Sequence, residues 1–371
     1  MKKINGHEMI QLFEQFAPKK YAMEGDKVGL QIGRLNKPLR RVMIALDVLE
    51  EVVDEAIEKE VDLIIAHHPL IYRPLQNITT DKLPGRMIEK LLKNEIAVYA
   101  AHTNLDVAKG GVNDLLAEAL QLSHTEVLVP THEVKLKKLV VYVPATESHQ
   151  VKDALGNVGA GAIGNYSHCQ FSTSGIGQFL PGEEANPHIG QNGKIEQVEE
   201  EKIETIFPDY LEKKVLQAMI KAHPYEEVAY DIYSLDNKGE TLGLGRMGKI
   251  KEMTLGEFVH KVKKALDVPT VRIVGDLQAK VKKVAVLGGD GNKYISSAKF
   301  KGADVYITGD LYYHVAHDAM MMGLNVIDPG HNVEKVMKKG VTHYLTKLCT
   351  EKDYDVHIFP SEKNTEPFQF V

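Results

Sequence analysis

Cysteine is scarce in this sequence, and its scarcity excludes two kinds of protein. The 371 residues contain only Cys169 and Cys349, which lie far apart in the chain. Two separated cysteines cannot form the disulfide framework of a small secreted domain, and they cannot supply a thiolate metal site. A metal in this protein must therefore be held by nitrogen and oxygen ligands.

Long apolar runs and an excess of basic residues are also missing. No apolar stretch approaches the roughly 20 residues that cross a bilayer, and no hydrophobic signal core follows the amphipathic start of the chain. The net charge is −6, with lysine and glutamate interspersed rather than gathered into the basic stripe of a nucleic-acid-binding protein. We therefore expect a cytosolic protein with neither a membrane nor a nucleic acid as its partner.

Buried strands alternate with helices in both outer parts of the chain. Apolar runs at 41–47, 61–66 and 96–101 are separated by helical patterns at 50–59 and 83–94. Strands and helices of this length in alternation are typical of βαβ units with a parallel sheet. The sequence therefore predicts the α/β fold class.

The α/β pattern returns from residue 281 as an internal repeat. Residues 40–45 resemble 282–287, and residues 62–66 resemble 304–308, with the same offset of 242 positions and no gap between the two matches. Buried strands share composition, so chance similarity is the alternative to duplication. The conserved strand–helix–strand spacing favours a duplication. We therefore predict two related halves whose strand ends converge on one cleft.

The middle of the chain has a different texture. Its elements follow a β-α-β, β-rich, β-α-β order, which suggests a ferredoxin-like α+β domain. Within it, residues 175–193 are rich in Gly, Pro and Asn and predict a loop, and the acidic run 196–206 predicts a solvated strand. We predict a first α/β half at 1–130, an inserted domain at 131–245 and a second α/β half at 246–371.

The sequence His67-His68-Pro69 lies directly after the buried strand 61–66. Ligand sites of open α/β sheets lie at the carboxyl ends of strands, and histidine is the commonest metal ligand among side chains. A pair of imidazoles at this place predicts a metal site. The alternative is a surface turn that happens to contain two histidines.

Three further residues extend this metal-site hypothesis. Asp106 follows the strand 96–101, and His331 and Glu334 lie three residues apart at the start of a helix predicted at 332–339. Residues at i and i+3 share a helix face. Taken singly, Asp106 can be a turn acceptor and His331 a capping residue.

The five candidates together form a set of three imidazoles and two carboxylates. Such a set suits zinc, manganese or iron rather than calcium. Five ligands exceed the needs of one tetrahedral zinc with an open position, but they suit two ions roughly 3.5–4 Å apart with a bridging carboxylate.

Other polar residues are expected near the same strand ends. Asp310 and His314 are the candidates for a general acid or base, and His102 and Asp47 can orient ligands or cap helices. The run 288–291 (GGDG) follows a strand, but it lacks the lysine and hydroxyl residues of a phosphate-binding loop, so we interpret it as a plain turn.

Six segments together resemble the Nif-three-like family, whose members are also described as GTP cyclohydrolase 1 type 2 homologs. They are residues 26–33, DLIIAHHPLIY at 62–72, AHTNLD at 101–106, GGVN at 110–113, GADVYITGD at 302–310 and IDPGHNVE at 327–334. The inserted region, with HPYEE at 223–227, is similar to PII-like and CutA-like modules.

This resemblance implies a structure and a site. Family members have two related α/β halves with a two-metal centre between them, and they assemble as ring-shaped homohexamers. The resemblance assigns as metal ligands His67, His68, Asp106, His331 and Glu334. It implies two divalent ions per subunit, zinc first, with iron or manganese as alternatives.

Two functions of different classes follow from this resemblance. The first is a metal-dependent hydrolase in which a water bridging the two metals attacks GTP or a related nucleotide-like substrate. The second is a non-enzymatic, metal-loaded ring that acts as a scaffold or regulator, with the inserted domain binding a small effector or a partner.

Overall fold

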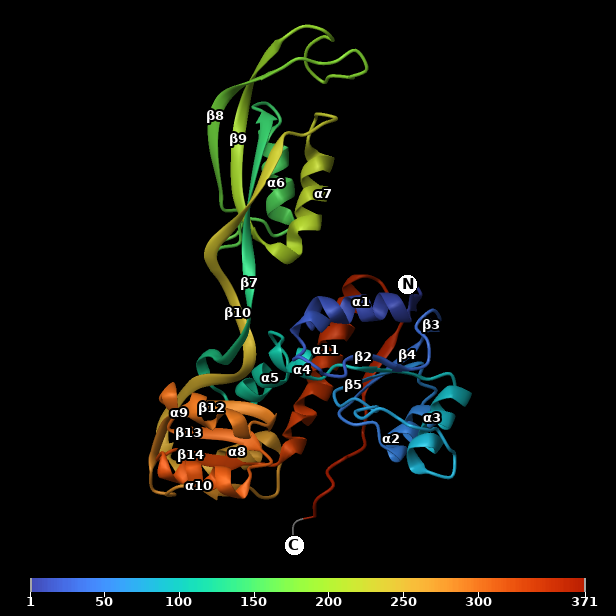
Figure 1. The fold of residues 1–371 in the computed structure, drawn as a ribbon, viewed down its shortest axis with the longest axis vertical. Helices are drawn as coiled ribbons and strands as arrows, with labels where there is room; N and C mark the ends of the chain where they lie inside the picture. The colour runs from blue at the N-terminus through green and yellow to red at the C-terminus, as the bar shows by residue number, and fades with distance from the viewer. Residues whose placement is uncertain (1, 370–371) are drawn as a thin grey trace. The chain divides into compact units, whose positions relative to one another are not determined.

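A computed structural model describes residues 2–369, and the chain divides into two compact units. Unit 1 contains the chain up to His132 and from Leu242 onward, and unit 2 contains Glu133–Thr241. Strands β7 (Ser123–Pro144) and β10 (Tyr230–Thr254) each pass from one unit into the other (Figure 1).

The first half of unit 1 is built from short strands and helices, with η denoting a 3-10 helix. They are β1 (Ile4–Asn5), α1 (Gly6–Phe16), η1 (Lys19–Tyr21), β2 (Gly29–Ile32), β3 (Pro38–Leu39), β4 (Arg41–Ala45), α2 (Glu50–Glu58), β5 (Leu63–Ala66), α3 (Leu83–Lys93), β6 (Ala97–Ala100), α4 (Thr103–Val107) and α5 (Val112–Ala119).

The chain after β10 forms the second half of unit 1. Its elements are α8 (Leu255–Leu266), β11 (Arg272–Val274), β12 (Lys280–Asp290), η3 (Asn292–Tyr294), α9 (Ile295–Phe300), β13 (Val305–Gly309), α10 (Tyr313–Met321), β14 (Asn325–Asp328), η4 (His331–Lys335), α11 (Val336–Glu351) and β15 (His357–Pro360). The last strand, β15, is the exception, because it joins the sheet of the first half.

The two halves of unit 1 repeat one sheet topology. In the first sheet the strand order is β15-β4-β5-β6-β2, and all neighbours are parallel except β2, which runs antiparallel to β6. In the second sheet β12, β13 and β14 are parallel, and β11 runs antiparallel to β14. The strands β4, β5, β6 and β2 thus have counterparts in β12, β13, β14 and β11. The α/β prediction is confirmed.

The repeat extends to individual hydrogen bonds. The carboxylate of Asp62 accepts from the backbone N–H groups of Arg40 and Arg41, at 2.6 and 3.0 Å. The carboxylate of Asp304, 242 positions later, accepts from Lys282 and Lys283 at 2.9 and 2.7 Å. Each aspartate fixes the start of one strand against the next in the same way.

The first sheet is buried on both faces, as parallel sheets are. Along β4, Val42 and Ile44 pack with α1 and α11, whereas Met43 and Ala45 pack with α2 and α3. The cluster on the α11 side also contains buried residues of β12 and β13, so one apolar core joins the two halves.

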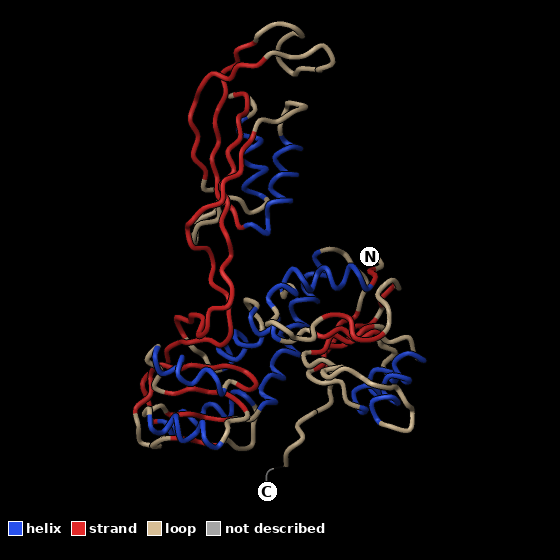
Figure 2. The backbone as a smooth tube through the Cα atoms, viewed as in Figure 1, coloured by secondary structure: helices blue, strands red, loops and turns tan. Residues whose placement is uncertain are grey.

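Unit 2 is a sheet with two helices on one face. Besides its parts of β7 and β10 it contains α6 (Ser148–Asn157), β8 (Gln170–Phe179), β9 (Glu196–Pro208), η2 (Asp209–Leu211) and α7 (Glu212–Ala222). The strand order is β10-β7-β9-β8, and α6 and α7 pack against one side of it (Figure 2). The expected loop at 175–193 is wrong at its start, because β8 pairs with β9 as far as Phe179.

Within residues 2–369, no helix is both long enough and apolar enough to cross a membrane.

Candidate metal centre

The strand β5 and its neighbours fix the position of the histidine pair. The N–H of His67 donates to the carbonyl of Ala45 at 3.0 Å, and the N–H of His68 donates to Leu46 at 2.9 Å. The parallel pairing of β4 and β5 therefore continues beyond Ala66. It fixes the backbones of His67 and His68 at the carboxyl end of β5. His67 is completely buried.

His331 and Glu334 lie on η4, and here the predicted helix needs a correction. The first turn is a 3-10 helix at His331–Lys335, and the α-helix α11 begins only at Val336 and runs to Glu351, well beyond the expected end at 339. A 3-10 helix has three residues per turn, so side chains at i and i+3 lie directly above one another. The imidazole and the carboxylate are therefore brought together, with 3.2 Å between His331 Nε2 and Glu334 Oε2.

The carboxylate of Glu334 is the point at which the two halves meet. Its Oε2 atom lies 3.1 Å from Nε2 of His68 and 3.6 Å from Nε2 of His67. Glu334 is 3% exposed. One buried carboxylate oxygen of the second half thus faces two imidazoles of the first half and one of its own.

Asp106 completes this cluster from α4. Its Oδ1 atom lies 3.6 Å from Nε2 of His67. Both atoms are among the four buried polar side-chain atoms of residues 2–369 that have no hydrogen-bond partner. Unpartnered buried polar atoms are costly, and a cation between them would satisfy both.

The outer nitrogen of each histidine is held by an acceptor. Nδ1 of His68 binds Asp47 at 2.7 Å, and Nδ1 of His331 binds Asp310 at 2.7 Å. Nδ1 of His67 binds the Ala101 carbonyl at 2.9 Å. Such partners are usual for histidines that bind metals, because they fix the ring and leave Nε2 free as the ligand atom.

A fourth histidine of the cluster is His102, just before α4. Its Nδ1 binds Asp26 at 2.8 Å, and Asp26 also accepts from the backbone N–H of Thr103 at 2.9 Å. We expected His102 in this region, but nothing in the sequence indicated that Asp26 would orient it. The pairing depends on the loop before β2 returning to the end of β6.

The electrostatics of the cluster favour a positive charge. Burial disfavours the imidazolium of His68, but Asp47 and Glu334 outweigh burial and raise its pKa to about 10. Burial is outweighed in the same way at His331, where Glu334 and Asp310 raise the pKa to about 9. Burial raises the pKa of Asp106 to about 6, although the His67 charge opposes this. The negative electrostatic potential that raises these pKa values also attracts metal cations.

Two glycines of β12 make room for these side chains. A Cβ atom on Gly289 would lie 2.7 Å from Glu334 Oε1 and 3.2 Å from His331 Nε2, and one on Gly288 would lie 3.0 Å from Glu334 Oε1. The interpretation of 288–291 as a plain turn is wrong, because β12 continues as far as Asp290 and its two glycines lie against the cluster. The missed signal is the glycine pair itself, at the end of this strand.

The two catalytic candidates from the sequence occupy different surroundings. Asp310 holds the ring of His331 and so lies behind that imidazole. His314 is exposed on α10, its ring lies against Tyr313, and it belongs to none of the metal-competent groups found in residues 2–369.

The geometry of the cluster fits metal ions. Three groups have ligand atoms within 4.8 Å of one another, namely His67–His68–His102, His68–His331–Glu334 and His67–Asp106–Glu334. Atoms bound about 2.1 Å from one tetrahedral ion lie roughly 3.4 Å apart. The 3.1–3.6 Å separations around Glu334 match this spacing.

The fold and the cluster define a class of protein. It is an α/β protein in which the strand ends of two repeated halves bring histidines and carboxylates into one group that can bind metal ions. The chain belongs to the Duf34/NIF3 (NGG1p interacting factor 3) family, whose model matches residues 4–367. The family resemblance of the sequence motifs is thereby confirmed.

Relatives match the chain over its whole length. A Bacillus subtilis relative, described as a GTP cyclohydrolase 1 type 2 homolog, is 65% identical over 371 residues, with 100% of both chains covered. The crystal structure of a Bacillus cereus protein related to NIF3 matches with a TM-score of 0.94 at 63% identity and 100% coverage of both chains. A Staphylococcus aureus protein structure matches with a TM-score of 0.74 at 33% identity, again with 100% of both chains covered.

Proposed function

We propose that unit 1 holds two divalent metal ions and is a hydrolase of GTP or a related nucleotide-like compound. The proposed ligands are His67, His68, Asp106, His331 and Glu334, and zinc is the first choice, with iron or manganese as alternatives. The observation that carries the proposal is the approach of three imidazole Nε2 atoms to one oxygen of Glu334, at 3.1–3.6 Å.

The proposal of two ions rests on the division of the proposed ligands into two groups that share Glu334. Glu334 belongs to one group with His68 and His331 and to another with His67 and Asp106. A carboxylate shared by two groups is suited to bridge two ions. When bound, such ions supply Lewis acidity and a lowered pKa for a coordinated water.

The chain itself can supply a proton-carrying group. His102 belongs to the cluster but is not among the five proposed ligands, and Asp26 holds its Nδ1 at 2.8 Å, so we assign its Nε2 as the atom that would accept or give a proton. A histidine oriented by a carboxylate is a common general acid or base. The support for GTP is the description of the Bacillus subtilis relative as a GTP cyclohydrolase homolog.

The test compares metal content with turnover. We expect the purified protein to contain two ions per chain by mass spectrometry of the metals and to consume GTP or another nucleotide. His68→Ala should lose at least one ion and the turnover, whereas His149→Ala, on the exposed surface of α6, should keep both.

A full metal complement without turnover in a broad nucleotide and phosphoester screen would reject the hydrolase. It would support the alternative, a metal-loaded scaffold or regulator whose inserted domain binds an effector or partner.

We also propose a ferredoxin-like fold of the PII or CutA-like type for unit 2. The support is the β-α-β-β-α-β order of β7, α6, β8, β9, α7 and β10, together with the sheet order β10-β7-β9-β8. In this order the first and second strands of the domain are separated by the third, as in a split βαβ unit.

We further propose that the chain assembles as a ring-shaped homohexamer. Three apolar side chains of α9 and α10 support assembly, because Phe300 is 94% exposed and Tyr313 and Met321 are each 75% exposed. Exposed apolar surface is a mark of interaction sites. Light scattering should give six times the 41.3 kDa mass of one chain, and Phe300→Glu should reduce that mass. A monomer in solution would reject the ring.

A further inference from the structure

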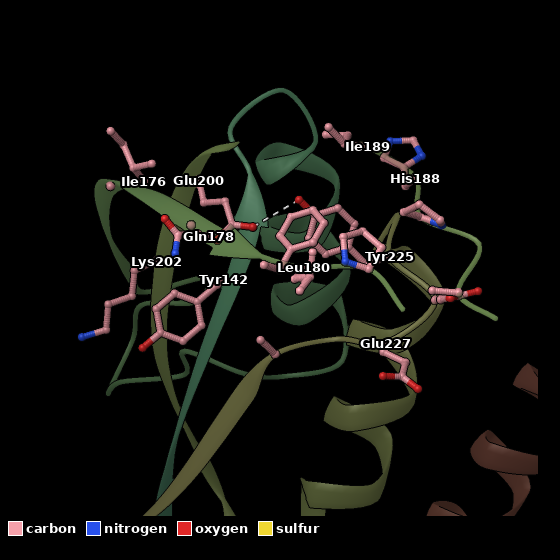
Figure 3. Close-up of a pocket in the computed structure, with 18 of the residues that line it drawn as sticks. Tyr142, Ile176, Gln178, Leu180, His188, Ile189, Glu200, Lys202, Tyr225 and Glu227 are labelled. Atoms are coloured by element: carbon pink, nitrogen blue, oxygen red, sulfur yellow. Dashed lines mark hydrogen bonds between the residues drawn. The ribbon is translucent and has the colours of Figure 1, made fainter. Parts of the chain in front are cut away.

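A cavity of about 920 Å³ lies within unit 2, apart from the metal centre (Figure 3). Its floor is formed by β8 and β9, and its walls by the loop 180–189 and the segment 225–229. A space of this size suits a small organic ligand, since such sites typically measure roughly 300–1,000 Å³.

The cavity lies over the sheet face that α6 and α7 leave uncovered. Tyr142, Lys202 and Thr173 form one cross-strand row, and the next row along the strands contains Glu200 and Gly175. Side chains alternate between faces along a strand. Residues that point to the opposite face, such as Val141 and Ile203, pack on the helices instead.

Glycines keep this part of the sheet hollow. Gly175 and Gly177 both face the cavity from β8, and a Cβ atom added to Gly175 would meet nothing within 4 Å. A Cβ atom on Gly177 would lie 2.2 Å from Oε2 of Glu200. The Glu200 carboxylate therefore lies across the space that a larger residue at 177 would occupy.

Glu200 places a negative charge inside the cavity. It is 9% exposed, and the hydroxyl of Tyr225 donates to its Oε1 at 3.2 Å (Figure 3). Lys202, which lines the same cavity, is bound instead to Glu204, with 2.5 Å between Nζ and Oε1. Within residues 2–369 Glu200 forms no salt bridge, although the imidazole of His223 is near enough to interact with its charge. A buried carboxylate without an ion-pair partner attracts a cation strongly.

The remaining lining adds acidic and aromatic groups, together with the imidazole of His188, whose Nε2 lies 3.7 Å from Glu147. Glu184, Glu226 and Glu227 are exposed at the rim. The rings of Phe179 and Tyr225 lie 5.8 Å apart. Aromatic faces attract cations, and they also bury apolar bodies.

We propose that this cavity binds a small organic cation, with an ammonium or guanidinium group at Glu200 and an apolar body against the rings of Tyr142, Phe179 and Tyr225. The site depends on residues of unit 2 alone, so it does not require the hydrolase proposed for unit 1.

The test measures the binding of tyramine, the probe, to the full chain by calorimetry. 4-Hydroxyphenethyl alcohol, which replaces the ammonium with a hydroxyl, is the neutral counterpart. Loss of a charge-assisted contact weakens binding by at least about tenfold, so we expect this weakening both for the alcohol and for Glu200→Gln. Glu183→Gln, on the wall loop 180–189 but outside the lining, should bind tyramine like the original chain.

A second variant separates loss of binding from loss of folding. Gly175→Val places a strand-forming side chain into the open space of the cavity, so it should keep the thermal stability and lose tyramine binding. Equal binding of amine and alcohol, unchanged tyramine affinity of Glu200→Gln, or no heat with tyramine, agmatine and spermidine at millimolar concentration would each overturn the proposal.

Discussion

At the scale of single residues, the proposed metal centre depends on side chains that hold the histidines. Asp310 fixes the ring of His331, and its own backbone has a φ of 51°. Asparagine tolerates this left-handed conformation, so Asp310→Asn keeps the backbone and weakens only the acceptor. Loss of such a partner typically lowers metal affinity by about 10–100-fold. Chelator competition should show a loss of about tenfold, with Asp318→Asn on α10 unchanged. Equal affinities of both variants would show that Asp310 does not position the ligand.

Gly289 should be as important as the ligands themselves. Its φ is 64°, and a Cβ atom would press on Glu334 and His331. We expect Gly289→Ala to lose metal binding in the chelator assay. Gly302→Ala is the matched control, because Gly302 has a φ of 78° and open space beside Lys283. Both changes should cost about 1–2 kcal/mol of stability, but metal affinity should fall only in the first. Normal metal binding by Gly289→Ala would contradict the close packing.

The sequence predicted those parts of the site that local pattern determines. His67 and His68 follow an apolar strand, so their place at a sheet edge could be inferred. Asp26 could not be assigned a role, because its contact with His102 depends on a loop 76 positions away in the chain. The 3-10 turn at His331 was missed since the i, i+3 spacing fits an α-helix equally well. Tertiary packing determines both the contact of Asp26 with His102 and the 3-10 turn at His331.

At the scale of elements, α2 is anchored to the segment after β15 by a buried carboxylate. Glu55 accepts from the hydroxyl of Ser361 at 2.5 Å and from the N–H of Glu362 at 2.9 Å. Burial disfavours its charge, but the Glu362 N–H, Lys59 and Ser361 outweigh burial and lower its pKa. The ionised form is therefore the one that stabilises the fold.

This linkage predicts a pH-dependent effect of Glu55→Gln. The folded pKa lies below the unfolded value of about 4.3, so the stabilisation is complete above that pH and is lost as the pH falls through the folded pKa. Denaturant unfolding at pH 7 should show a loss of about 1–3 kcal/mol. The difference between the two proteins should shrink below about pH 4, and a difference independent of pH would argue against the carboxylate as the cause.

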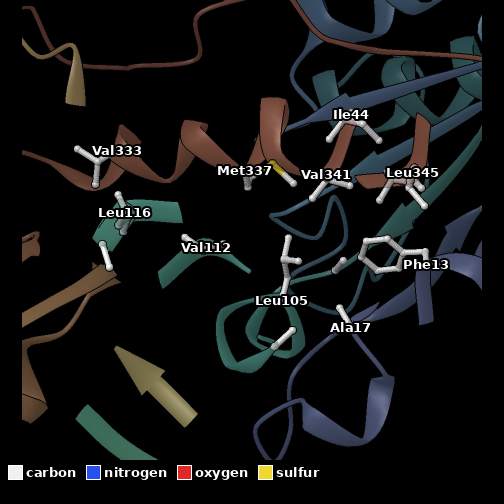
Figure 4. Close-up of a cluster of buried hydrophobic side chains, with 14 of the residues drawn as sticks. Phe13, Ala17, Ile44, Leu105, Val112, Leu116, Val333, Met337, Val341 and Leu345 are labelled. Carbon is white, nitrogen blue, oxygen red and sulfur yellow. The ribbon is translucent and has the colours of Figure 1, made fainter. Parts of the chain in front are cut away.

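At the scale of the whole molecule, the two units have separate apolar cores. Leu345 of α11 is completely buried in the core of unit 1, beside Phe13 and Val341 (Figure 4). Ile203 of β9 is completely buried in the core of unit 2. The five proposed metal ligands all belong to unit 1. The two units should therefore respond differently to core mutations and to metal.

Calorimetry should separate the two units as two transitions. Truncation of a buried Leu or Ile to Ala costs about 2–5 kcal/mol, so Leu345→Ala should lower one transition and Ile203→Ala the other. A metal that binds only the folded state stabilises it by about 4 kcal/mol at a thousandfold excess over its dissociation constant. Zinc should therefore raise the transition that Leu345→Ala lowers and leave the other unchanged. A single transition that both variants lower equally would instead show that β7 and β10 transmit unfolding from one unit to the other.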